Sequence, residues 1–218
     1  MGRRKAKPRM ALFLNHPECS AQCSVGMYEA LYTHFDIEFF GKDGFNSRIF
    51  KSADIISFPG GIGDSETFHK YIGDNKYYVQ EAISYGVRYL GICMGAYWAG
   101  SHYFDIVDGF DCVQYIKRPK SGMRRSFATT VPVHWYTEQV DMFFYDGCTY
   151  TGDEKYFYTV ARYKNKDPMA VIQNRIGLIG CHPESMKSWY TNDKMKLKWH
   201  EFYHHKLLLD FAKLLMEC

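Results

Sequence analysis

A cysteine between two glycines is the part of this sequence best suited to chemistry. The segment from Gly91 to Gly95 reads GICMG and follows an apolar run, Val87 to Ile92, that we expect to form a buried strand. A cysteine between a strand and a helix predicts a sharp turn, the nucleophile elbow, that exposes the side chain. The glycines prevent collisions in this crowded turn. The pattern therefore predicts a nucleophilic thiol at Cys93, and the N-terminal end of the following helix favours its thiolate form.

A histidine and a glutamate two residues apart follow another apolar run, residues 177–181. Pro183 lies between them and holds His182 in an extended conformation. In an extended chain, residues i and i+2 point to the same side, so the Glu184 carboxylate can fix the tautomer of the His182 ring. The second ring nitrogen then faces a nucleophile. Together with Cys93, these residues predict a catalytic triad.

A glycine loop at a third strand end completes the candidate site. The strand-like run 54–58 ends in a proline followed by Gly60 and Gly61, where the backbone can approach a ligand closely. We expect the N–H groups of Met94 and Gly61 to hold an oxyanion, with Gly60 and Tyr97 also contacting substrate. Open α/β sheets place their active sites at the carboxyl ends of parallel strands, where all three signals fall.

Three motifs together resemble the class I glutamine amidotransferase-like superfamily: FPGG at 58–61, GICMG at 91–95 and GCHPE at 180–184. The resemblance extends from about Met10 to about Tyr190. It implies a flavodoxin-like α/β fold and a triad of cysteine, histidine and glutamate in this chain order.

Within the superfamily, the sequence is most similar to the biotin-protein-ligase N-terminal-like (BPL_N) domain. The similarity rests on the spacing of Cys93, Gly95 and Tyr97 and on the opening segment 14–19, which reads LNHPEC. Glutaminases of the superfamily usually carry a substrate-holding glutamine four residues after the cysteine, where this chain has Tyr97. We recognise neither an ATP-using synthetase module nor a biotin-ligase catalytic domain in these residues.

These observations predict a cysteine-dependent hydrolase or acyl transferase that acts on a small amide or acyl substrate. A second hypothesis is a catalytically inactive ligand-binding or regulatory module of the same fold. A third is the intracellular-protease and isomerase branch of this fold, which uses a different acidic partner near the cysteine. We expect a small-molecule substrate, no cofactor and no metal.

Composition and charge narrow the class of protein. The 218 residues include 46% hydrophobic ones and carry a net charge of +3, which is too small to indicate a nucleic-acid partner. Basic residues gather in the tail 1–9 and in 117–125, which we interpret as solvated segments. The seven cysteines form no regular framework, so we expect a reducing, cytoplasmic location. The spacing of Cys19 and Cys23 would allow a disulfide or a metal site, but no second pair has zinc-ligand spacing, so we interpret both as small hydrophobic residues. No apolar run is long enough to span a membrane.

The order of elements predicts a mostly parallel open sheet flanked by helices, with an antiparallel β insertion, in a single domain over 10–218. Ser24 is the expected N-cap of a helix over 25–34, and Asp146-Gly147 is the expected turn of a β-hairpin. The expected strands are 10–14, 36–40, 54–58, 87–92, 127–136, 142–145, 148–151, 156–163, 170–173 and 177–181, and a second helix covers 77–85.

One rival motif is H-E-x-x-H at 200–204, which in zinc proteases places two histidines on one helix. His200 and His204 share their expected helix face with Leu207 and Phe211, so we interpret the face as packed rather than as a metal site. The aromatic residues of the insertion are the candidate lining of a pocket above Cys93.

Overall fold

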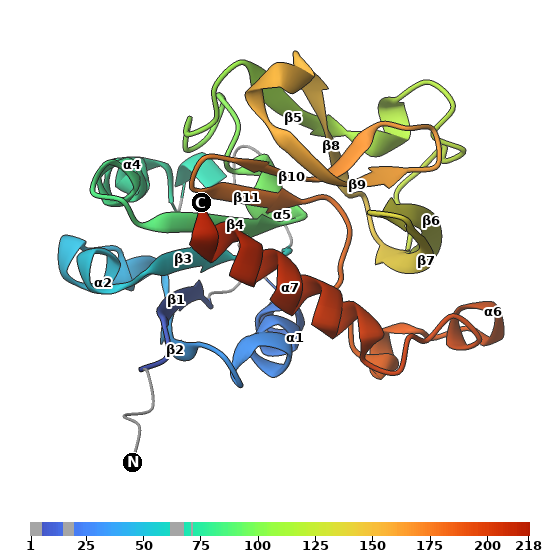
Figure 1. The fold of residues 1–218 in the computed structure, drawn as a ribbon, viewed down its shortest axis with the longest axis horizontal. Coiled ribbons are helices and arrows are strands. Elements are labelled where there is room, and N and C mark those ends of the chain that lie inside the picture. The colour runs from blue at the N-terminus through green and yellow to red at the C-terminus, as the bar shows by residue number, and fades with distance from the viewer. Residues whose placement is uncertain (1–5, 15–19, 62–67, 71) are drawn as a thin grey trace.

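The computed structural model describes residues 6–14, 20–61, 68–70 and 72–218 and shows an α/β fold with helices against a large mixed sheet (Figure 1). The predicted fold class is confirmed. The opening segment 15–19 and most of the basic tail lie outside the described residues. The strands are β1 (Arg9–Phe13), β2 (Asp36–Phe40), β3 (Ile55–Phe58), β4 (Arg88–Ile92), β5 (Phe110–Gln114), β6 (Thr129–Trp135), β7 (Glu138–Phe144), β8 (Cys148–Gly152), β9 (Tyr158–Tyr163), β10 (Pro168–Gln173) and β11 (Ile176–Ile179).

Helices cover both faces of the parallel part of the sheet. Because side chains alternate along a strand, Met10 and Leu12 face α1 and α7, whereas Ala11 and Phe13 face α2 and α4. The Asn46 side chain accepts the Ile49 N–H and caps α2. The helices are α1 (Ala21–Leu31), α2 (Ser47–Ser52), α4 (Lys76–Ser84), α5 (Met94–Tyr97), α6 (Asp193–Lys196) and α7 (Tyr203–Glu217).

The parallel strands bring four chain segments to one edge of the sheet. Their order is β2-β1-β3-β4-β11, and each neighbouring pair is parallel. The segments that follow β1, β3, β4 and β11 therefore leave the same edge. They carry Cys23, Gly60, Cys93 and His182, respectively.

The antiparallel part differs from the prediction at one turn. The sheet continues as β10-β9-β6-β7, while β5 and β8 form a separate two-stranded sheet. Asp146 has the positive φ, 52°, that a turn residue adopts. Yet β7 pairs with β6, and β8 pairs with β5, so the predicted Asp146-Gly147 hairpin is wrong. The segment joins two sheets instead, and Gly147 lies against the carbonyl of Gly180.

The first helix also starts earlier than predicted. It begins at Ala21 after Ser20, so Ser24 lies inside the helix rather than at its N-cap. The Ser24 hydroxyl donates to the Phe13 carbonyl at 3.0 Å, which ties the first turn of the helix to the end of β1. In the described part of the chain, no helix is long and apolar enough to cross a membrane.

Two glycines allow the backbone at Cys93 to pack closely. A Cβ on Gly95 would lie 2.0 Å from the Phe58 carbonyl oxygen, and one on Gly91 would lie 2.4 Å from the Gly95 carbonyl oxygen. Both contacts are with rigid backbone, so a side chain would push the turn away from β3. The glycines of the motif therefore have the steric role that the sequence predicts.

We expect Gly95→Ala to lower the free energy of unfolding by about 2 kcal/mol or more, because a methyl group has no space beside Phe58. Gly41→Ala is the control, since the nearest atom to its Cβ is the Leu14 carbonyl oxygen at 3.4 Å. Its effect should stay within about 0.5 kcal/mol. Urea denaturation measures both values, and equal stabilities for the two variants would contradict this account of the turn.

Candidate active site

Cys93 occupies a strained turn between β4 and α5. Its backbone has φ 49° and ψ −104°, a region that residues with a side chain rarely adopt. The Cys93 N–H donates to the Ile179 carbonyl at 2.8 Å, and the Gly95 N–H donates to the Pro59 carbonyl at 3.2 Å. The turn is thus held from both sides, by the last residue of β11 and by the residue that follows β3. This geometry turns the thiol away from the sheet and toward the surrounding loops.

The helix after Cys93 is short. α5 covers only Met94–Tyr97, so its dipole contributes less to a thiolate than a full helix would. The thiol lies 3.7 Å from the Tyr145 carbonyl oxygen, to which it donates when protonated.

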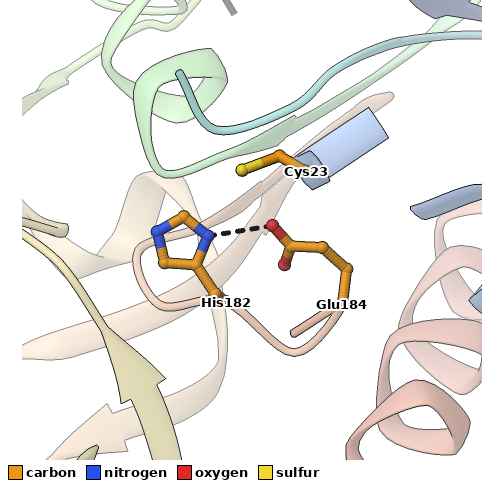
Figure 2. A group of neighbouring side chains, drawn as sticks. All are labelled: Cys23, His182 and Glu184. Carbon is orange, nitrogen blue, oxygen red and sulfur yellow. Dashed lines mark hydrogen bonds and ion pairs between the residues drawn. The ribbon is translucent and has the colours of Figure 1, made fainter. Parts of the chain in front are cut away.

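His182 and Glu184 meet as the extended His-Pro-Glu segment predicts. The ring Nδ1 lies 2.9 Å from Oε1 of Glu184 (Figure 2). Both side chains are buried, with Glu184 0% and His182 4% exposed. Gly26 of α1 packs against the Glu184 backbone, where a Cβ would lie 2.3 Å from the carbonyl oxygen. The close helix therefore holds the carboxylate in place.

The neighbours of His182 favour its charged form. Burial of the ring lowers its pKa, but the nearby Cys93 thiol and Glu184 carboxylate, together with hydrogen bonds to two thiols, outweigh burial. The net result is a His182 pKa well above the usual value. An imidazolium at this position can stabilise a thiolate on Cys93.

The glycine loop has two different roles. A Cβ on Gly60 would lie 2.6 Å from Cε1 of His182, so this residue leaves space for the ring. Gly61 lines the pocket that contains Cys93 and Met94. Among the described residues, the Cys93 and Gly95 N–H groups are already engaged in hydrogen bonds. Between them lies the Met94 N–H, which the sequence predicts to bind an oxyanion.

The pocket has a volume of about 790 Å³, and aromatic side chains form much of its wall. Tyr97 lies in it and donates its hydroxyl to the Asp146 carbonyl at 3.2 Å. Burial, followed by nearby thiols and Asp146, raises the Tyr97 pKa, so the phenol stays neutral. Of the aromatic residues in the insertion, Phe143 and Tyr145 line the pocket, whereas Trp135, Phe144 and Tyr150 are core residues.

Trp189 and Cys23 were not assigned to the site from the sequence, although both line the pocket beside His182. Trp189 packs against His182 with ring centroids 5.7 Å apart. Cys23, interpreted as a small hydrophobic residue, lies in the first turns of α1 and points toward His182 (Figure 2). Its position shortly after the first predicted parallel strand was the available signal, because such positions reach the same sheet edge as Cys93.

The H-E-x-x-H segment does not form a continuous helix. Glu201 and Phe202 have positive φ values, 45° and 67°, and α7 starts only at Tyr203. The expectation that both histidines lie on one helix is therefore wrong, although the His200 and His204 rings stack with centroids 4.0 Å apart. Within the described residues, they belong to no cluster of three metal-ligating atoms. The predicted packing is confirmed for His204, Leu207 and Phe211, which are buried, whereas His200 is half-buried.

Solved structures of glutamine amidotransferase-like proteins share this fold. PurLQS from Thermotoga maritima has a TM-score of 0.65 and 17% identity, covering 96% of this chain and 100% of that chain. A glutamine amidotransferase from Thermotoga maritima has a TM-score of 0.69 and 11% identity, covering 98% and 100%. One from Methylobacillus flagellatus has a TM-score of 0.61 and 11% identity, covering 98% and 94%.

At these identities, the similarity establishes the fold alone. No protein-family model matches the sequence, and no curated protein is similar to it. The fold is that of the class I glutamine amidotransferase-like proteins.

We expect the buried His204 to destabilise the protein in acid. Burial, followed by the neighbouring His205, lowers the pKa of His204 from 6.5 to about 4. Between these pH values the unfolded chain binds a proton that the folded chain does not, so stability falls as pH falls. The contribution of His204 is up to about 3 kcal/mol. The pKa of His182 is raised, so its protonation changes stability only above about pH 6.5 and not in the range where His204 titrates.

Thermal melting of wild type and His204→Gln between pH 7 and pH 4 measures this effect, with the exposed His34→Gln as control. The melting temperature of His204→Gln should fall less steeply with acid than that of wild type or the control. Parallel curves for all three proteins would contradict the assignment.

Proposed function

We propose that this chain is a cysteine-dependent hydrolase or acyl transferase that acts on a small amide or acyl substrate. Cys93 is the nucleophile, His182 the general acid and base, and Glu184 the residue that orients the ring. The observation that carries the proposal is the buried His182, held by Glu184 and adjoining the thiol of Cys93 in the same pocket.

The reaction begins when the Cys93 thiolate attacks the acyl carbon and forms a C–S bond. The carbonyl electron pair moves to the oxygen, which the N–H groups of Met94 and Gly61 stabilise. His182, as imidazolium, gives its Nε2 proton to the leaving amine as the C–N bond breaks. Water, deprotonated by His182, then cleaves the thioester, or an acceptor nucleophile takes the acyl group.

The wall of the pocket favours a substrate with apolar parts. Phe143, Tyr145 and Trp189 surround the approach to Cys93, and the volume of about 790 Å³ fits a small molecule. Tyr97 stands where related glutaminases usually carry glutamine, and its hydroxyl is engaged with the Asp146 carbonyl. This favours a substrate other than glutamine.

We also propose that the chain is related to the BPL_N domain family, because it has the same spacing of Cys93, Gly95 and Tyr97. The protease and isomerase branch of the fold is disfavoured, because Glu184 at 2.9 Å already supplies the acidic partner of His182.

The test of the triad is the rate of Cys93 alkylation by iodoacetamide at neutral pH, resolved by site with mass spectrometry. We expect Cys93 to be labelled rapidly in wild type, because the His182 imidazolium, whose pKa is raised, stabilises a thiolate beside it. In His182→Ala the labelling rate should fall by about tenfold or more. His34→Ala, which changes an exposed histidine, should match wild type.

The Glu184→Gln variant tests the contribution of the negative charge of the carboxylate, because the side chain keeps nearly the same shape. Gln still accepts a hydrogen bond from the ring but removes the negative charge that helps raise the His182 pKa. The labelling rate of Cys93 should therefore lie between those of wild type and His182→Ala. A Cys93 that reacts slowly and identically in all these proteins would refute the triad.

The alternative is a catalytically inactive binding module, and the replacement of glutamine by Tyr97 is the observation that favours it. Such a module would bind small molecules in the same pocket with an inert Cys93. With a substrate found by screening amides and thioesters, unchanged turnover in Cys93→Ser would exclude the proposed chemistry.

A further inference from the structure

Cys23 is a second thiol in the site that the proposed reaction does not use. It lies near the start of α1, is 6% exposed and points toward His182 and Glu184 (Figure 2). A Cβ on Gly60 would lie 3.1 Å from its sulfur and 2.6 Å from the His182 ring. The missing side chain at Gly60 therefore allows the thiol and the ring to lie close together.

The three side chains present a sulfur, a nitrogen and an oxygen within 4.8 Å of one another. A tetrahedral zinc ion, with bonds of about 2.0 Å to nitrogen and oxygen and about 2.3 Å to sulfur, separates its ligand atoms by roughly 3.3 to 3.6 Å. The Cys23, His182 and Glu184 atoms reach that arrangement by small side-chain shifts. The ring nitrogen that faces Glu184 is Nδ1.

Glu184 provides an independent indication of a ligand. Its Oε2 atom is buried and has no hydrogen-bond partner among the described residues. A carboxylate oxygen in this condition carries an energetic cost that a bound cation removes. The carboxylate is 0% exposed, so water at the surface does not satisfy it.

The donor set selects the kind of ion. Thiolate and imidazole ligands suit Zn²⁺ and similar borderline ions, whereas Mg²⁺ and Ca²⁺ prefer oxygen ligands alone. A deprotonated Cys23 and the Glu184 carboxylate together balance the charge of a divalent ion beside a neutral His182. The pocket reaches both Cys23 and His182, which opens a path from solvent.

We propose that Cys23, His182 and Glu184 bind a zinc-type divalent ion. While the ion is bound, His182 cannot act as the general acid and base of the proposed triad. On binding, the Cys23 thiol gives its proton to solvent and Nδ1 of His182 gives up its proton to coordinate the metal. The fourth position of the ion faces the pocket. Metal binding at these residues does not depend on the proposed function, whereas the inhibition by zinc rests on it.

Coordination at Nδ1 changes what His182 can do. A neutral ring with the metal on Nδ1 carries its proton on Nε2, so it has no lone pair to accept a proton from Cys93. The metal also takes the carboxylate that otherwise orients the ring. The site therefore holds either a triad or a metal ion, and zinc inhibits turnover by competing for His182 and Glu184.

The first test is calorimetric titration of the reduced, metal-free full chain with Zn²⁺ in the presence of a competing chelator. Wild type should bind one equivalent, and Cys23→Ala and Cys23→Ser should bind at least about tenfold more weakly, since even outer groups of a metal site contribute about that much. Cys218→Ser, which removes an exposed thiol, should bind like wild type. Equal affinity in wild type and in both Cys23 variants overturns the proposal.

Cobalt separates the two thiols of the pocket. With Co²⁺, wild type and Cys93→Ser should both show a thiolate-to-cobalt charge-transfer band, which Cys23→Ser should lack. A band that disappears only with Cys93→Ser would place the metal on the nucleophile and overturn the assignment. Cys93→Ser also tests the metal site in a protein in which the proposed reaction is blocked.

A third measurement needs no substitution, in case Cys23 variants fail to fold. In wild type, Zn²⁺ should slow iodoacetamide labelling of Cys23, and a chelator should restore it. Unchanged labelling of Cys23 at saturating Zn²⁺ overturns the proposal. Zinc binding without alkylation or turnover evidence for an active Cys93 would refute the proposed function alone.

Discussion

The buried hydrogen bond between His182 and Glu184 is the interaction on which the rest of the site depends. An ionised carboxylate away from water is costly unless a charged or donor group compensates it. The ring at 2.9 Å does so for Oε1 of Glu184, and the same contact favours the charged ring. The buried carboxylate therefore needs the His182 ring beside it, and in return it favours the positive charge on that ring next to Cys93.

Close backbone contacts hold His182 and Glu184 in position relative to the Cys93 thiol. Gly26 lets α1 contact the Glu184 backbone, Gly60 leaves space for the His182 ring, and Gly95 lets the elbow contact β3. At each position an added Cβ would collide, in two of the three cases with backbone atoms that cannot move aside. The loops after β1, β3, β4 and β11 are therefore positioned by main-chain packing, which fixes their side chains more precisely than surface loops allow.

The sequence predicted the parts of this site that depend on near neighbours in the chain. The elbow at Cys93 and the pairing of His182 with Glu184 follow from spacing and backbone geometry alone. Asp146 is an example of what local sequence does not determine. Its turn conformation was predictable, but the pairing of the flanking strands, β7 with β6 and β8 with β5, depends on distant residues. Cys23 was missed for the same reason, because its contact with His182 exists only once β1 and β11 lie in one sheet.

Two thiols lie near one imidazole, and their surroundings favour Cys93 as the proposed nucleophile. Burial raises the pKa of the Cys23 thiol, despite its hydrogen bond with His182, so Cys23 stays protonated where Cys93 is proposed to react. Cys93 stands at a strained elbow beside the Met94 N–H, where an oxyanion would form. A metal ion must displace the Cys23 proton to bind, which weakens its hold at neutral and acidic pH. Zinc affinity should therefore rise with pH.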